Sequence, residues 1–236
     1  IYFYTYTPVS DDSTVAAWTQ GTAITSAEPD PGKRFGHRMA INDNGDILAV
    51  SSISLGDAGK VEIFTRGGNN DGSTANTWVH RHTLRGTDSA DSTVNTSFGE
   101  SISMSKDGTT LVIGATGVDN DIQSDIGAIY IYKWDANNDS TQSYTLDQTI
   151  LSPETAINMQ FGSTVHMNND ATRIVIGARG YDNARDMLFD NGKTTFDLQD
   201  TQIIDLNSSS GGVFTATKYN DNFLLDGKLV TTNVSS

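Results

Sequence analysis

The chain has no cysteine among its 236 residues, so it has no disulfide, no zinc–thiolate site and no cysteine nucleophile. Apolar residues come only in short runs, well below the roughly 18 needed to cross a bilayer, and we expect no membrane insertion. Basic residues are scarce, with 15 against 29 acidic ones and a net charge of −14. A surface this acidic repels phosphate backbones, which excludes nucleic acid as an expected partner.

Helical patterning is also lacking, because no segment repeats apolar residues at i, i+3, i+4 and i+7 over three turns. A signal peptide is not visible either, and the chain opens on a strand-like run at Ile1. We therefore expect an all-β segment that forms part of a larger chain or assembly.

A repeated dipeptide is the most informative feature that the sequence does contain. Phe-Gly occurs at 35–36, 98–99 and 161–162, with a spacing of 63 residues both times. Each copy opens a similar stretch of sequence, and a fixed period of this size is typical of radial or stacked repeat architectures.

Four strands are predicted in each copy. The first shows period-2 alternation, with Ile102 and Met104 facing one way and Ser101 and Ser103 the other. A tight polar turn follows, at 43–46, 106–109 and 169–172. The second strand is a continuous apolar run, which predicts a strand covered on both faces. The expected strands are 35–42, 47–52, 60–65 and 77–84; 98–105, 111–116, 128–133 and 143–150; and 161–168, 174–179, 212–217 and 222–230.

The N-terminal segment matches only the second half of a unit. Residues 1–6 resemble the third strand and 18–24 the fourth, with Trp18 in register with Trp78 and Tyr144. The sequence thus predicts half of a preceding unit at 1–34 and full units at 35–97, 98–160 and 161–236. The last unit carries a long insertion at 180–210.

Four antiparallel strands per unit with a polar hairpin between the third and fourth predict the blades of a β-propeller. A parallel solenoid is the alternative, but its repeats are usually much shorter. Closing a ring takes at least four blades, so three full blades and a half predict an incomplete set.

At these residues the chain resembles the FG-GAP repeat family, whose β-propeller repeats occur in integrin α-subunit heads and many extracellular proteins. The second copy carries the pattern most fully, with Phe98-Gly99, Asp107-Gly108, Gly114-Ala115 and the strand that begins at Gly127. The resemblance implies a propeller fold and an extracellular, cell-surface or virion-surface location. It leaves the activity open, because propellers host many functions.

The resemblance implies calcium as a candidate ion, since family members often bind it between the first two strands. Here those turns offer at most two carboxylates and are too short to wrap an ion. The loop at 117–127 is the better candidate, with a possible Ca²⁺ held by Asp119, Asn120, Asp121 and Asp125. A loop whose side chains bond their own backbone is the alternative.

The long insertion of the third copy is the predicted interaction site. Loops beyond about 15 residues in compact repeats are usually functional or disordered, and this one carries apolar residues that argue against pure disorder. It either contacts a neighbouring subunit or covers its own unit. The candidate contact residues are Tyr181, Asp186, Met187, Leu188, Phe189 and Phe196.

Catalytic motifs are not found: the sequence has no nucleophile elbow, no HExxH and no P-loop, so we predict neither catalytic residues nor a bound organic cofactor. His80 and His82 are expected on one strand face and could chelate a metal, although two histidines without a third ligand more often belong to a solvated outer strand. Alternation predicts that half of each of two aromatic sets faces outward and could stack on a sugar; aromatic packing between neighbouring blades is the alternative. The two sets are Tyr2, Phe3, Tyr4 and Tyr6, and Tyr130 and Tyr132.

The expected function is that of a non-enzymatic scaffold or adhesion module of an extracellular, cell-surface or virion-surface protein. Its repeat loops would contact other protein subunits or surface glycans. Two alternatives stay open at this point: a calcium-dependent binding module, and a fragment of a propeller hydrolase that acts on glycans.

Overall fold

The computed structural model covers the whole chain, and it describes residues 1–7, 17–54, 58–66, 77–86, 95–120, 124–135, 143–153, 158–180, 212–220 and 222–230. The interaction residues predicted between Tyr181 and Phe196, together with Asp121 of the calcium loop, lie outside these ranges.

Over the described ranges the fold is all-β, with three four-stranded antiparallel sheets and one two-stranded sheet, each ordered as an antiparallel meander. This confirms the prediction of four strands per repeat, with the Phe-Gly pair in the first strand of each four-stranded sheet. The strands are β1 Tyr4–Thr7 and β2 Ala17–Gln20; β3 Arg34–Ile41, β4 Ile47–Ile53, β5 Lys60–Thr65 and β6 Val79–Leu84; β7 Phe98–Met104, β8 Thr110–Ala115, β9 Ala128–Asp135 and β10 Ser143–Leu151; and β11 Phe161–Met167, β12 Arg173–Ala178, β13 Gly212–Tyr219 and β14 Asn222–Val230.

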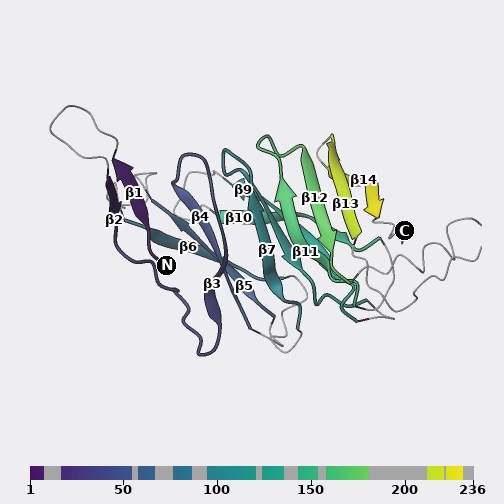
Figure 1. Ribbon diagram of the computed structural model, residues 1–236, viewed down its shortest axis with the longest axis horizontal. Coiled ribbons are helices and arrows are strands. Elements are labelled where there is room, and N and C mark those ends of the chain that lie inside the picture. Colours follow the sequence, from purple (N-terminus) through teal and green to yellow (C-terminus); the bar gives the residue numbers. More distant parts are fainter. Residues whose placement is uncertain are drawn as a thin grey trace, which may run out of the picture.

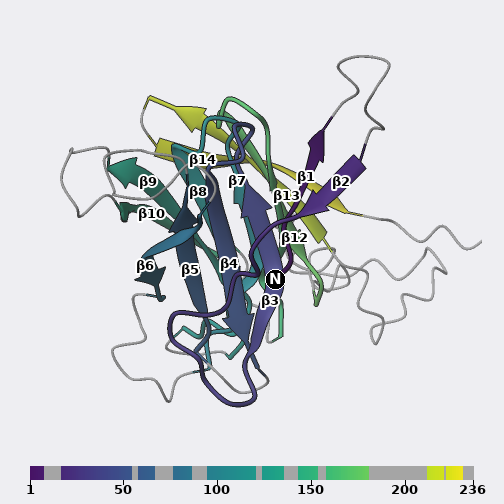
Figure 2. The ribbon, with the colours of Figure 1, turned by 90° about the vertical axis from the view of Figure 1, so that its left-hand side faces the viewer.

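The sheets follow one another in chain order along the long axis of the molecule (Figure 1). Seen from the end that carries β1 and β2, they lie one behind another like blades (Figure 2). The first strands β3, β7 and β11 contact each other in sequence. The described sheets form an open row, which is the arrangement of propeller blades without a closed ring. In the described ranges, no helix is long and apolar enough to cross a membrane.

The apolar core lies between the sheets, in layers that we call seams. The first seam joins β3–β6 to β7–β10, and the second joins β7–β10 to β11–β14. The first seam is filled by Ile47, Ala49, Val61, Ile63, Leu84, Phe98, Leu111, Ile113, Ala115, Val118, Ala128, Tyr130, Tyr132 and Tyr144. A smaller apolar cluster between β1–β2 and β3–β6 contains Ile24, Leu48, Val50 and Phe64.

The Phe-Gly pairs form the backbone contacts of the two seams. The Phe98 N–H donates to the Ala58 carbonyl of the preceding sheet at 2.9 Å, and the Phe161 N–H donates to the Ile126 carbonyl at 3.0 Å. The glycine that follows adopts a positive φ, +96° at Gly99 and +88° at Gly162. A Cβ on Gly162 would lie 2.6 Å from the Ala128 carbonyl oxygen, so only glycine allows this close approach.

The alternation of β7 is present, but its serine face is the more buried one. Ser101 and Ser103 are buried whereas Ile102 and Met104 are only partly so. Both serines face the third sheet: Ser101 Oγ donates to the Gly162 carbonyl at 2.7 Å, and Ser103 Oγ accepts the Met167 N–H at 3.0 Å. The hydroxyls satisfy backbone groups where two strands meet without a common ladder.

The second strands of the first two complete sheets are buried as predicted, but that of the third sheet is not. β4 and β8 are buried along their whole length, as expected. β12 instead alternates, and its Val175 is 43% exposed. The expectation that all three are covered on both faces was wrong for β12, because no described sheet follows on that side.

Candidate functional site

The predicted calcium loop is partly described, and its two described carboxylates lie at the ends of the loop. Asp119 Oδ1 accepts the Asp125 N–H at 2.7 Å, and Asp125 itself adopts φ +54°. Asp119 thus has the backbone-bonding role that the alternative interpretation assigns to it. No group of three potential metal ligands is found among the described residues, but Asp121 is outside them, so the calcium site stays a prediction.

The polar turns between the first and second strands have a common internal architecture. Asn42 Oδ1 accepts the N–H groups of Asp46 and Ile47, both at 3.0 Å. One repeat later, Ser105 Oγ accepts the Thr110 N–H at 2.9 Å. In the third copy the same role falls to an asparagine at 168, which accepts two N–H groups. One side-chain oxygen per copy therefore fixes each turn.

Backbone hydrogen bonds join the three turns into one edge. The Asp43 N–H donates to the Lys106 carbonyl at 2.9 Å, and the Lys106 N–H donates to the Asn169 carbonyl at 3.0 Å. Lys106 Nζ also lies 3.3 Å from Asp43 Oδ2. We call this row of turns, residues 43–46, 106–109 and 169–172, the tip edge. In Figure 1 the three hairpins lie along the upper side of the molecule.

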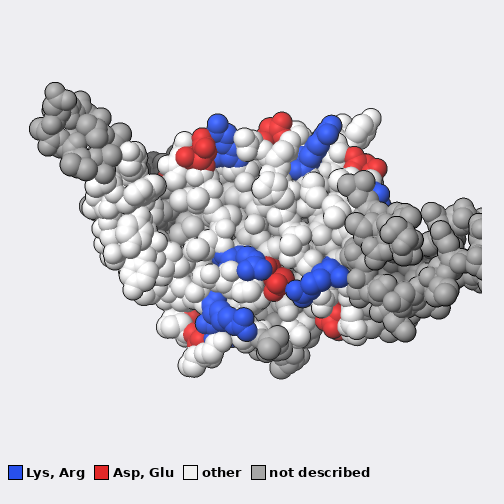
Figure 3. All heavy atoms as spheres, in the orientation of Figure 1, with Lys and Arg blue, Asp and Glu red and all other residues white. Residues whose placement is uncertain are grey.

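The tip edge is exposed and charged. Asp43, Lys106 and Asp170 are exposed, and the upper rim of the space-filling view shows acidic and basic groups close together (Figure 3). Partial burial works to raise the pKa of Asp107, but hydrogen bonds from Thr109 and Ser105 outweigh it and lower that pKa. The hydroxyl of Thr172 likewise lowers the pKa of Asp170. Both carboxylates are ionised and held in place at neutral pH.

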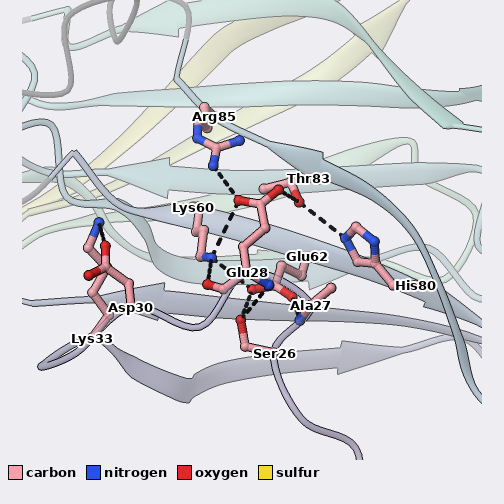
Figure 4. Close-up of polar contacts among 10 residues, drawn as sticks. All are labelled: Ser26, Ala27, Glu28, Asp30, Lys33, Lys60, Glu62, His80, Thr83 and Arg85. Atoms are coloured by element: carbon pink, nitrogen blue, oxygen red, sulfur yellow. Dashed lines mark hydrogen bonds and ion pairs between the residues drawn. The ribbon is translucent and has the colours of Figure 1, made fainter.

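A buried charged network lies elsewhere, where the segment between β2 and β3 crosses β5. Glu62 is completely buried, and its carboxylate accepts the Ser26 hydroxyl at 2.5 Å and the Ala27 N–H at 2.8 Å (Figure 4). Lys60 Nζ lies 3.1 Å from Glu62 Oε1 and donates to the Glu28 carbonyl at 2.5 Å. No local sequence pattern indicates this network, because its members come from segments that are far apart in the chain.

Glu28 extends the network to the surface and to β6. It accepts hydrogen bonds from Thr83 Oγ1 at 2.8 Å and from Arg85 at 2.5 Å (Figure 4). Partial burial works to raise the pKa of Glu28, but these two bonds, with the charges of Arg85 and Lys60, lower it to about 2. A carboxyl that is this acidic is a poor general acid at neutral pH. The network is suited to fastening the segment between β2 and β3 onto the sheet.

The two histidines of β6 do not share one face of the sheet, as residues two apart in a regular strand would. A β-bulge sets His80 opposite Phe64 and His82 opposite Ile63, and these two partners contribute to different apolar clusters. His80 Nε2 lies 3.1 Å from Thr83 Oγ1. Burial first, then the charges of His80 and Arg85, lower the pKa of His82. The expectation of a shared face was wrong because Arg81 is the extra residue at the bulge.

The predicted aromatic groups separate into an exposed set and a buried set. Tyr2, Tyr4 and Tyr6 are exposed on one side of the two-stranded sheet. Tyr130 and Tyr132 are both buried in the first seam. The alternation expected within each set does not hold, because residues two apart in a strand share a face.

Comparison with known proteins agrees with this geometry. The family model of the FG-GAP repeat matches residues 87–132, which include β7, β8 and most of β9. No curated protein matches the chain. Residues 87–132 are thus similar to an FG-GAP repeat, and the described four-stranded sheets have the arrangement of β-propeller blades.

Proposed function

We propose that the chain is a non-enzymatic interaction module of an extracellular or surface-exposed protein, and that the tip edge contacts its protein partner. The observation that carries this proposal is the backbone ladder that joins the three turns. The ladder holds exposed charges at fixed positions, so little conformational entropy of this surface is lost when a partner binds.

The chemistry of the carboxylates supports binding over catalysis. Hydrogen bonds within the chain lower the pKa values of Glu28, Asp107, Asp170 and Asp226. General acids at neutral pH need the opposite shift. Charges presented in this way steer a partner of complementary charge and set its orientation. Because the whole chain is acidic, a partner with a basic surface fits best.

The test compares a tip-edge variant with a matched variant elsewhere. The chain is screened against a panel of purified extracellular proteins and a glycan array, by biolayer interferometry at low and high salt. We expect binding to a basic protein that Asp43→Asn combined with Asp170→Asn weakens at least tenfold. Asp226→Asn, at an exposed carboxylate on the β13–β14 ladder, should leave the binding unchanged.

Three results would contradict the proposal. Equal weakening by the tip-edge and control variants would remove the tip edge from the interface. Loss of binding in chelator would favour the calcium-dependent module. Turnover of a panel of chromogenic glycosides by the wild-type chain would favour the glycan hydrolase.

A further inference from the structure

The two-stranded sheet exposes a face made almost entirely of aromatic side chains. Tyr2 is 69% exposed and Trp18 68%, and Tyr4 and Tyr6 are about half exposed. Tyr6 and Trp18 are directly opposite each other, with ring centroids 5.2 Å apart. In a chain with a net charge of −14, the described residues of this face carry no ionisable group other than tyrosine hydroxyls. Contiguous exposed apolar surface of this kind marks interaction sites.

Register shows what this face corresponds to in the complete blades. Tyr4 and Tyr6 pair with Gln20 and Trp18 in β1–β2, as Tyr132 and Trp134 pair with Leu146 and Tyr144 in β9–β10. Trp18 therefore corresponds to Tyr144, and Tyr4 to Tyr132. Two residues earlier in each strand direction, Tyr2 corresponds to Tyr130 in the same way.

All three of these counterparts are buried where a sheet meets its predecessor. Tyr130, Tyr132 and Tyr144 are 1%, 4% and 2% exposed in the first seam. The hydroxyl of Tyr144 donates to the Gly108 carbonyl and that of Tyr132 to the Arg85 carbonyl. The aromatic face of β1–β2 is thus a seam surface by position, left uncovered by the described residues.

The opposite face of the two-stranded sheet packs against the following sheet. Phe3 packs edge-on against Trp78 at 5.8 Å, and the Arg66 guanidinium lies 4.3 Å from the centre of the Phe3 ring. Ile1 joins the cluster beneath β4 and β5. The sheet therefore has one face packed on its successor and one face that the described residues leave uncovered.

The other end of the row exposes the complementary surface. Val175 is 43% exposed and Val213 36%. By register they correspond to Ala49 and Val61, which are fully buried in the first seam against the aromatic residues of the next sheet. The molecule thus presents the aromatic side of a seam at one end and the side that packs against it, with Val175 and Val213, at the other.

We propose that two copies of this chain associate head to tail, with the Tyr2–Tyr4–Trp18 face of one copy packed on the Val175–Val213 face of the other. The contact repeats the geometry of the first seam, with the same side of a sheet facing its neighbour. Such an interface uses different surfaces on the two partners, so it can extend into a ring or a filament. This inference does not depend on the tip edge.

Charge and salt give the association a characteristic signature. The aromatic face is uncharged, whereas the Val175–Val213 face also carries Arg173, on the same side of β12, and Asp226, which accepts hydrogen bonds from Thr215 and Thr217. Each copy carries −14, so net repulsion opposes the contact and salt relieves it. We expect association to strengthen with ionic strength. Binding through the tip edge would weaken under the same change, which separates the two proposals.

The test uses the full chain and two variants that each block one end. In sedimentation velocity at rising concentration and moderate salt, the weight-average mass of the wild type should rise to twice 25.4 kDa or more. Trp18→Ser and Val175→Lys should each stay at the monomer mass. An equimolar mixture should give a dimer that grows no further, because each variant keeps one intact end.

The same measurements can overturn the proposal. A wild type that stays monomeric at every concentration excludes self-association. A dimer that is lost in Trp18→Ser but kept in Val175→Lys means that two aromatic faces meet, and the head-to-tail arrangement is wrong. A monomeric wild type whose tryptophan fluorescence is quenched by a neutral oligosaccharide such as maltohexaose would assign the face to sugars. Both changes are at exposed positions, and circular dichroism with urea midpoints checks that the variants fold.

Discussion

At the residue scale, the Phe-Gly pair works because its two members do different tasks at one seam. The phenylalanine ring packs within its own sheet, as Phe98 does with Tyr130 and Phe161 with Phe214, at 5.3 Å in both cases. Its backbone N–H crosses to the preceding sheet, and the glycine lets that sheet approach. Gly114 of the second copy lies against Gly162 of the third, so the Gly-Ala and Phe-Gly elements of neighbouring repeats meet.

Replacement of the seam glycine should therefore cost more than replacement of a glycine with the same backbone angle in open space. Gly162→Ala combines φ +88° with a Cβ 2.6 Å from a carbonyl oxygen. Gly32→Ala has φ +87° with nothing within 4 Å. Backbone strain alone costs about 1–2 kcal/mol, so we expect that loss for Gly32→Ala and a larger one for Gly162→Ala. Urea unfolding measures both, and equal losses would mean that the seam is not packed as described.

The acidity of Glu28 predicts a pH dependence of stability. Its pKa is about 2 in the folded chain against an ordinary value of 4.5, so its contribution is present above about pH 4.5 and is lost as pH falls toward 2. The gap in unfolding free energy between the wild type and Glu28→Gln should narrow over that interval. Urea titrations at a series of pH values measure it, and a gap that stays constant would show that the Thr83 and Arg85 contacts do not form.

At the element scale, each hairpin between first and second strands depends on one side-chain oxygen. Asn42 is 4% exposed, and its removal leaves the N–H of buried Ile47 without a partner. Asn42→Ala should cost about 1–3 kcal/mol in unfolding free energy. Asn42→Ser should recover part of the loss, because Ser105 has this role one repeat later. Equal destabilisation by alanine and serine would show that the oxygen does not matter.

Strand positions could be predicted from the sequence because period-2 patterning, tight-turn residues and a fixed spacing all agreed. The prediction of 222–230 as a strand has the same limits as β14. The buried side of β7 could not be predicted from the sequence. Alternating serines are typical of a solvent-exposed face, and only the backbone of the next sheet supplies the partner that buries Ser101. The bulge in β6 is likewise set by pairing with β5.

The candidate site was less predictable than the fold. The turns at 43–46, 106–109 and 169–172 were recognised as turns, but their alignment into one edge depends on hydrogen bonds between repeats. The Glu62 network joins residues more than 30 positions apart, and no local pattern reports such a contact. Register between repeats could have found the aromatic face, because Tyr4 and Tyr132 occupy the same strand position.

At the scale of the whole molecule, the chain is a one-dimensional array in which each sheet contacts its neighbours. Stability in such arrays is approximately a sum of unit and interface contributions, and the end units lack one interface. That accounts for the exposed Trp18 face at one end and the exposed Val175 at the other. The tip edge crosses all three complete sheets and is therefore a continuous surface, which is why we propose it as the partner-binding one.

The most direct test of the account is whether neighbouring repeats meet at the tip edge. Because the chain has no cysteine, Asp43→Cys combined with Lys106→Cys gives a clean pair across one step of the ladder. Mild oxidation should join them within one molecule, seen as a loss of two hydrogens by mass spectrometry without a dimer. Asp43→Cys with Asn169→Cys spans two steps, about 10 Å at ordinary strand spacing, and should not close. A first pair that stays reduced, or a second pair that closes as readily, would contradict the stacking of blades that the Phe-Gly period produces.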